Sequence, residues 1–130
     1  MISRRNIRVK VMQTLYAIES REEDIKPSEA VKFLQKHFDQ SRQLLVYIIY
    51  FITEVARYVE KDSRNRASKH LPTKEDLVVN TKLAGNELLW KILESPAWKQ
   101  VIKEDKPHLI EDNDLIRKIF QELAEREEYK

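Results

Sequence analysis

Apolar side chains recur at three- and four-residue intervals along most of the chain, which is the spacing of amphipathic α-helices. Residues 4–20 contain neither glycine nor proline. Ser3 precedes them as a candidate N-cap, because its hydroxyl can accept a backbone N–H of the first turn. The pattern therefore predicts a first helix within residues 1–20. At about 100° per residue, one stripe of this helix consists of Ile7, Val11, Thr14, Leu15 and Ile18.

The same spacing continues through residues 28–68, after an acidic loop. No glycine or proline interrupts this stretch, so nothing in it forces a break. Two interpretations stay open. The first is a short helix at 28–38 followed by a long one at 41–68, with Asp39 and Ser41 as possible caps, and the second is one continuous helix. The apolar positions that carry the period are Val31, Leu34, Phe38, Leu45, Ile48, Ile49, Ile52, Val55, Ala56 and Val59.

Shorter helices are predicted in the second half of the chain, after a connection at 69–80. One helix covers residues 81–94, a short one begins after Ser95 with Pro96 in its first turn, and the last covers residues 112–128. The apolar residues expected to face inward from the first and last of these are Leu83, Leu88, Leu89, Ile92, Leu115, Ile116, Ile119, Phe120 and Leu123.

Two local signals complete the prediction of the fold. Thr73 and Asp76 have the spacing of a capping box, although Asp is a weaker partner than Glu in that role. The last predicted helix runs to the end without a C-cap, so we expect the chain to continue past Lys130. Together the patterns predict an all-α protein, residues 1–130 forming a single domain. We expect a compact helical bundle of about five to six helices, including one long central helix.

The composition agrees with helices and argues against several kinds of site. One glycine and four prolines are too few for a β-rich protein, and the absence of cysteine removes disulfides, thiolate zinc sites and cysteine nucleophiles. A phosphate-binding loop needs several glycines, whereas Gly85 stands alone. His37, His70 and His108 are too far apart to suggest a shared metal ion. We therefore expect no metal, no cofactor, no small-molecule substrate and no enzymatic activity.

The distribution of apolar residues also bears on location. The longest apolar run, Leu44 to Ile52, is about half as long as a membrane span. The first residues lead directly into arginines, without the apolar segment of a secretory signal. We expect a cytoplasmic protein with no membrane partner.

Charge is distributed unevenly along the chain, although 24 Lys and Arg against 22 Asp and Glu give a net charge of only +2. The start of the chain holds Arg4, Arg5, Arg8 and Lys10, with no acidic residue before Glu19. Arg4 and Arg8 are one helical turn apart and Arg5 is adjacent to them, so the three form a ridge beside the apolar stripe. Lys10 points elsewhere. The positive field of the protein is therefore expected at this end.

These residue types suit a nucleic-acid strand. A guanidinium group donates two hydrogen bonds to one phosphate and stacks on bases, and a helix N-terminus adds free N–H groups and positive partial charge. An amide can read base edges and a phenol ring can stack on an unpaired base. The alternative is a helical protein–protein interaction module, whose basic end only keeps it soluble. The residues predicted to bind single-stranded RNA are Arg4, Arg5, Arg8, Lys10, Gln13 and Tyr16.

A second basic cluster lies near the end of the long predicted helix. Two interpretations stay open for it: cations that complement the dipole at a solvated helix end, or an extension of the RNA surface. A helix-turn-helix DNA reader is disfavoured, because no short glycine-containing turn precedes a basic helix. The cluster consists of Arg57, Lys61, Arg64, Arg66 and Lys69, with Glu60 and Asp62 among them.

The first predicted helix also resembles a known family. Residues 4–17 are similar to the opening helix of the transcription antitermination factor NusB family, which has an arginine-rich arm, then Ala-Arg where this chain has Ile7-Arg8, then Gln-x-Leu-Tyr, matched by Gln13 to Tyr16. Residues 63–82 and 118–130 resemble the long NusB proteins of the Bacteroidetes type more loosely. The family's C-terminal helical half, with its Asn-Glu-Ala and Phe-Val-Asn-Gly segments, is absent from these 130 residues. The resemblance thus covers an N-terminal portion of such a protein.

The resemblance implies an all-helical factor that binds the single-stranded boxA element of ribosomal RNA leader transcripts. It implies a ribosomal protein acting as NusE as a partner, in a complex that helps RNA polymerase pass terminators. Carried over to this chain, the arm is Arg4, Arg5 and Arg8, and the Gln-x-Leu-Tyr element supplies Gln13 and Tyr16. Leu15 is expected in the core.

Overall fold

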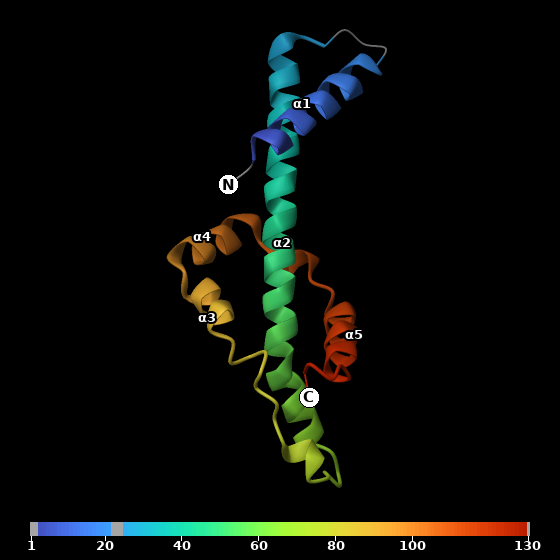
Figure 1. Cartoon of the computed structure of the whole chain (residues 1–130), viewed down its shortest axis with the longest axis vertical. Helices are drawn as coiled ribbons and strands as arrows, with labels where there is room; N and C mark the ends of the chain where they lie inside the picture. Colours follow the sequence, from blue (N-terminus) through green and yellow to red (C-terminus); the bar gives the residue numbers. More distant parts are fainter. Residues whose placement is uncertain (1–2, 22–24, 130) are drawn as a thin grey trace. The chain divides into compact units, whose positions relative to one another are not determined.

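The computed structural model describes residues 3–21 and 25–129, and within them it contains five α-helices, two short 3-10 helices and no strand (Figure 1). The predicted all-α class is confirmed, as is the single long helix. The elements are α1 (Arg4–Glu19), α2 (Pro27–Ala67), η1 (Glu75–Leu77), α3 (Glu87–Glu94), α4 (Pro96–Asp105), η2 (Pro107–Ile110) and α5 (Asn113–Ala124).

The chain divides into two compact units, which are described in turn. The N-terminal unit is Met1–Leu45, and it contains α1 and the first part of α2. The C-terminal unit is Val46–Lys130, and it contains the rest of α2 and all later helices.

In the N-terminal unit, α1 begins where the sequence predicts. The hydroxyl of Ser3 accepts the backbone N–H of Asn6 at 3.2 Å, as an N-cap does. Figure 1 shows α1 crossing the first part of α2. Between these helices Thr14 is only 4% exposed, and its hydroxyl lies 3.2 Å from Nδ1 of the half-buried His37. The contact side of α1 is therefore centred on Thr14.

Two residues of the predicted apolar stripe of α1, Ile7 and Leu15, are exposed. Val11 and Ile18 are half-buried, whereas Leu15 is 56% exposed, so its expected place in the core is wrong. Leu15 follows Thr14 directly and lies about 100° around the helix from it, which turns it off the contact side. Ile7 lies close to Thr14 in angle but near the open end of α1, and it is also exposed.

The long helix α2 is continuous, so the second of the two interpretations is correct. Ser41 does not cap a new helix. Its hydroxyl donates a hydrogen bond to the backbone carbonyl of His37 at 2.9 Å, four residues earlier, inside the helix. The Ser41 hydroxyl, which suggested a helix break, thus forms its hydrogen bond within a continuous helix.

The core of the C-terminal unit forms between α2 and α5. Its buried residues are Val55 and Val59 of α2 and Ile116 and Phe120 of α5. The ring of Phe120 packs against Tyr58, with 5.3 Å between ring centroids. Half-buried Leu83 packs against the same cluster from the turn before α3, which ties the connecting segment to this core.

The boundaries of two predicted helices need correction. The helix predicted at 81–94 begins only at Glu87, because the side chain of Asn86 accepts the N–H groups of the first turn and makes Asn86 the N-cap. Gly85 lies in the preceding turn, where an added Cβ would come 3.0 Å from the carbonyl oxygen of Thr81. Leu88, expected to face inward, is exposed. The helix predicted from Pro96 is confirmed.

The last helix, predicted at 112–128, ends at Ala124. A turn after it returns Tyr129 to the core, where its ring meets Phe120 edge-on at 6.2 Å. The Tyr129 hydroxyl donates to the carbonyl of Asn80 at 3.0 Å, and the Asn80 amide donates to the carbonyl of Tyr129 at 2.6 Å. Burial raises the pKa of the Tyr129 hydroxyl. This pair of hydrogen bonds links the segment after α2 to the segment after α5.

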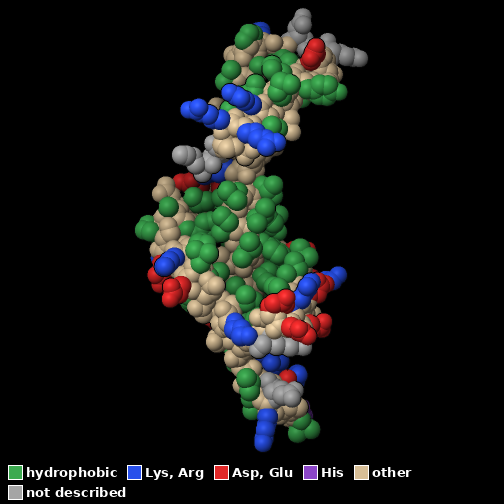
Figure 2. Space-filling model, viewed as in Figure 1, with side chains coloured by type: hydrophobic (Ala, Val, Ile, Leu, Met, Phe, Trp, Pro, Cys, Tyr) green, Lys and Arg blue, Asp and Glu red, His purple; other side chains and the backbone are tan. Residues whose placement is uncertain are grey.

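The C-terminal unit also leaves apolar side chains in contact with solvent. Figure 2 shows hydrophobic side chains gathered over its upper part, in the orientation of Figure 1. Ile48 and Ile52 of the predicted α2 stripe are exposed, as are Leu115 and Leu123 of the α5 stripe. The predicted inward positions of Leu115 and Leu123 are therefore wrong, whereas Ile48 and Ile52 carry the helical period of α2 but lie before Val55, where the part of α2 that α5 covers begins.

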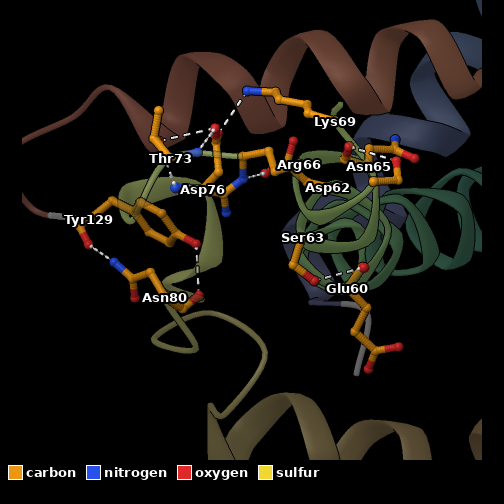
Figure 3. A network of polar contacts seen from close by, with 11 residues as sticks. Glu60, Asp62, Ser63, Asn65, Arg66, Lys69, Thr73, Asp76, Asn80 and Tyr129 are labelled. Atoms are coloured by element: carbon orange, nitrogen blue, oxygen red, sulfur yellow. Dashed lines mark hydrogen bonds and ion pairs between the residues drawn. The ribbon is translucent and has the colours of Figure 1, made fainter. Parts of the chain in front are cut away.

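The connection after α2 contains the capping box that the sequence predicts (Figure 3). The backbone N–H of Thr73 donates to a carboxylate oxygen of Asp76 at 3.1 Å, and the N–H of Asp76 donates to the Thr73 hydroxyl at 3.2 Å. Lys69 Nζ contacts the same carboxylate at 2.7 Å. The hydrogen bond from Lys69, followed by the one from the Thr73 backbone, lowers the pKa of Asp76 from 3.8 to about 2.

This shift predicts that acid weakens the connection. A folded-state pKa below the unfolded-state value means that Asp76 stabilises the fold above about pH 4 and loses this effect as the pH falls toward 2. In Asp76→Asn we expect a thermal unfolding midpoint that is lower than the parent's at pH 6 and converges with it at pH 2. Circular dichroism melts across this range measure the difference. Asp39→Asn, at an exposed position of α2, serves as the control; the same convergence in the control would contradict the prediction.

Candidate nucleic-acid interface

The six residues predicted to bind RNA all lie on α1, within the N-terminal unit. Five of them are exposed, and Lys10 is half-buried. Among the side chains that the structure describes, Arg4, Arg5, Arg8 and Lys10 form no ion pair. No acidic residue occupies the first turn of α1. The positive charge at this end of the helix is therefore not neutralised within the described residues.

The outward face of α1 combines cations with large side chains. Arg5 is nine residues from the buried Thr14, which places the two on opposite sides of the helix. Tyr16 lies about 20° from Arg5 in angle and is 74% exposed. Met12 lies on the same face and is 68% exposed. In Figure 2, basic side chains gather on the N-terminal unit. The arrangement offers guanidinium groups and an open aromatic ring on one surface.

Met12 was missed by the interpretation of the sequence. The signal was present, because Met12 is four residues before Tyr16 and both fall opposite the buried stripe. Methionine is a flexible apolar side chain that can pack against the face of a base or of a protein partner. It therefore belongs to the candidate surface, without favouring either class of partner.

Lys10 and Gln13 lie on another side of α1. They line a cavity of about 250 Å³ together with Asn6 and Val9 of α1 and with two residues of α2. The cavity thus carries one cation and two amide groups, which are the hydrogen-bonding groups that read base edges. The predicted set is therefore divided: Arg5 and Tyr16 face outward, while Lys10 and Gln13 line a neighbouring depression.

The second basic cluster, in the C-terminal unit, is divided as well. Arg57, Lys61 and Arg64 line one cavity of about 380 Å³ beside the start of α5. Arg66 is nine residues from Arg57 and so lies on the opposite side of α2, where its Nε is 2.8 Å from the carboxylate of Asp62. The structure therefore brings three of the four predicted residues to this cavity, while Arg66, paired with Asp62, lines a neighbouring one.

The structure also bears on metal ligation and on membrane crossing. Within residues 3–21 and 25–129 no three His, Cys, Asp or Glu side chains are grouped so as to hold a metal ion. His37 is engaged with Thr14, and its ring lies 4.6 Å from that of Phe33. None of the described helices combines the length and the apolar character that crossing a membrane requires.

Comparisons of the chain with protein-family models, with curated proteins and with solved structures find no match.

Proposed function

We propose that this protein is an RNA-binding transcription antitermination factor of the NusB type, and that α1 binds single-stranded RNA of the boxA kind. The observation that carries the proposal is the outward face of α1, where Arg5 and the open ring of Tyr16 lie on the same side of the helix, about three turns apart, with Arg4 and Arg8 exposed near Arg5. The similarity of residues 4–17 to the family's opening helix supports the same function.

The arginines supply the electrostatic part of this binding. Arg4, Arg5 and Arg8 are exposed, so each guanidinium can reach a phosphate without first breaking an ion pair among the described residues. The positive end of the helix dipole lies at the same place. These contacts attract any phosphate backbone, and they position the strand rather than select its sequence.

The remaining residues supply contacts to bases. The ring of Tyr16 can stack on an unpaired base, whereas a base inside a duplex has no free face to offer. Gln13 and Asn6 line a cavity on another side of α1 and carry amide groups that can pair with base edges. Single-stranded RNA is therefore the class of nucleic acid that fits this surface best.

The wider function follows from the resemblance alone. The protein would act in the cytoplasm with the ribosomal protein that serves as NusE, in the antitermination complex of RNA polymerase. A helical protein–protein interaction module is the second candidate. The exposed side chains of Met12 and Leu15 favour it, because apolar residues on a helix face suit a protein partner.

The test is the salt dependence of RNA binding, measured by fluorescence anisotropy with a labelled single-stranded RNA. Each phosphate neutralised contributes about −0.7 to the slope of log K against log salt, so Arg4→Ala, Arg5→Ala and Arg8→Ala together are expected to reduce the slope by about 2. The matched control replaces three exposed lysines of the same unit, Lys26, Lys32 and Lys36, with alanine. The proposal fails if the arginine variant keeps the parent's affinity and slope, or if the control loses as much.

A further inference from the structure

A groove runs along the contact between α2 and α5 in the C-terminal unit. A cavity of about 380 Å³ joins Arg57 and Lys61 of α2 to Asn113 at the start of α5. A second cavity of about 400 Å³ lies further along both helices and joins Lys69 of α2 to Gln121 of α5. The two helices therefore run in the same direction here. Both cavities are lined by Tyr58 and Asn65, so they adjoin.

Several cations line this groove, and internal carboxylates engage some of them. Arg57 contacts Glu54 at 2.9 Å, and Lys69 contacts Asp76 at 2.7 Å. Figure 3 shows Lys69 directed toward Asp76, with Asn65 nearby on α2. These pairs hold two cations in place but use part of their charge. Arg57 and Lys69 therefore contribute less to the positive potential of the groove than cations that have no such partner.

Three cations of the groove have no ion-pair partner among the described side chains: Lys61 and Arg64 of α2, and Arg117 of α5. Lys61 lies 5.9 Å from the centre of the Tyr58 ring. Lys61 and Arg64 line the first cavity and Arg117 lines the second. Unpaired positive charge therefore borders both cavities.

Glu111 lines the first cavity just before α5, and a hydroxyl of α2 engages its carboxylate. The carboxylate of Glu111 accepts the hydroxyl of Tyr50 at 2.7 Å. Burial and this hydrogen bond together raise the pKa of the Tyr50 hydroxyl well above its usual value, so Tyr50 keeps the proton that it donates. Glu111 is thus fixed against α2 by a neutral partner, and its charge is directed toward that hydroxyl.

The neutral polar groups of the groove suit nucleotides. Asn65 is shared by the two cavities, Asn113 lines the first and Gln121 the second. Each amide has both donors and an acceptor, as base edges and 2′-hydroxyl groups require. Each cavity falls within the size range of sites that hold small ligands, which suits a single splayed nucleotide better than a duplex.

We propose that the groove between α2 and α5 is a second RNA-binding site, which takes consecutive nucleotides of a single strand. Lys61, Arg64 and Arg117 contact phosphates, and Asn65 lies between the two nucleotides. The inference rests on the proposed function for the choice of RNA as the ligand. Its residues belong to the C-terminal unit alone, and it does not depend on α1.

The test uses the full chain with Lys61, Arg64 and Arg117 replaced by glutamine, which keeps the side chains long and polar. With a labelled oligouridine probe, three lost phosphate contacts are expected to reduce the salt slope by about 2, as for the arginines of α1. The control replaces three exposed lysines of the same unit, Lys82, Lys99 and Lys103, with glutamine and should keep the parent's slope. Circular dichroism melts verify that both variants are folded.

The outcomes separate this inference from the proposed function. A reduced slope in the groove variant alone supports the groove and overturns binding by α1, whereas a reduced slope in the α1 variant alone overturns the groove. Photo-crosslinking of the same probe carrying 4-thiouridine is expected to label peptides from residues 57–69 and 113–121, and labelling confined to other peptides overturns the groove. Competition by polyglutamate that equals competition by unlabelled RNA also overturns it, because an acidic protein partner would then fit as well.

Discussion

Replacing Phe120 with alanine is expected to lower the free energy of unfolding of the C-terminal unit by about 3–5 kcal/mol. Phe120 is 3% exposed and belongs to the buried cluster with Val59 and Ile116. Its ring also packs against Tyr58 on one side and Tyr129 on the other. Alanine would remove these contacts and leave a cavity, which could close only if α2 and α5 moved closer to each other.

Denaturant titration measures this loss, with tryptophan fluorescence as the signal. Both tryptophans, Trp90 and Trp98, lie in the C-terminal unit, so their emission reports on that unit. Leu123→Ala on the same helix is the control, because Leu123 is partly exposed and should cost about 1 kcal/mol or less. Equal losses in the two variants would show that Phe120 does not lie at the centre of this core.

Periodicity predicted helices well where the chain offers no competing local signal. Beyond Pro27 at its first position, α2 lacks glycine and proline, and its apolar spacing alone indicates a helix. Whether it breaks near Ser41 could not be predicted, because a serine hydroxyl can cap a new helix or bond to the carbonyl four residues back. The structure has the second arrangement.

Boundaries failed where side chains compete for the backbone. The spacing of Leu83 with later leucines suggested a helix from residue 81, but Asn86 accepts the first-turn N–H groups and delays α3 to Glu87. The segment after α5 turns back to the core, where Tyr129 exchanges hydrogen bonds with Asn80, which is 49 residues away. No local pattern contains that information.

The candidate sites could likewise be predicted where helix geometry suffices, but not where packing between helices is needed. The grouping of Arg4, Arg5 and Arg8 at the start of α1, with Tyr16 on the face of Arg5 about three turns later, follows from helix geometry, so the sequence suffices to propose it. The separation of Arg66 from Arg57 could also have been predicted from the sequence. Nine residues make two and a half helical turns, which puts the two side chains on opposite sides of the helix. The groove could not be predicted from the sequence, because it forms only when core packing places Arg117 of α5 beside α2.

Replacing Tyr16 with alanine is expected to weaken binding of single-stranded RNA by about 5- to 150-fold, because stacking on an aromatic ring contributes about 1–3 kcal/mol per base. The slope of log K against log salt should stay at the parent's value, since no phosphate contact is lost. Tyr16→Phe keeps the ring and is expected to bind within about threefold of the parent, which corresponds to less than about 1 kcal/mol. Anisotropy titrations at several salt concentrations measure both quantities.

The matched control is Leu15→Ala, which removes an exposed apolar side chain of the adjacent position that has no π face to stack on a base. If stacking holds the RNA, Leu15→Ala binds like the parent, and the loss is specific to Tyr16. Equal losses for the two variants would mean that α1 makes a general apolar contact, as a surface for a protein partner does. The ratio of the two affinities therefore decides between the proposed RNA site and the alternative interaction module on the same face of α1.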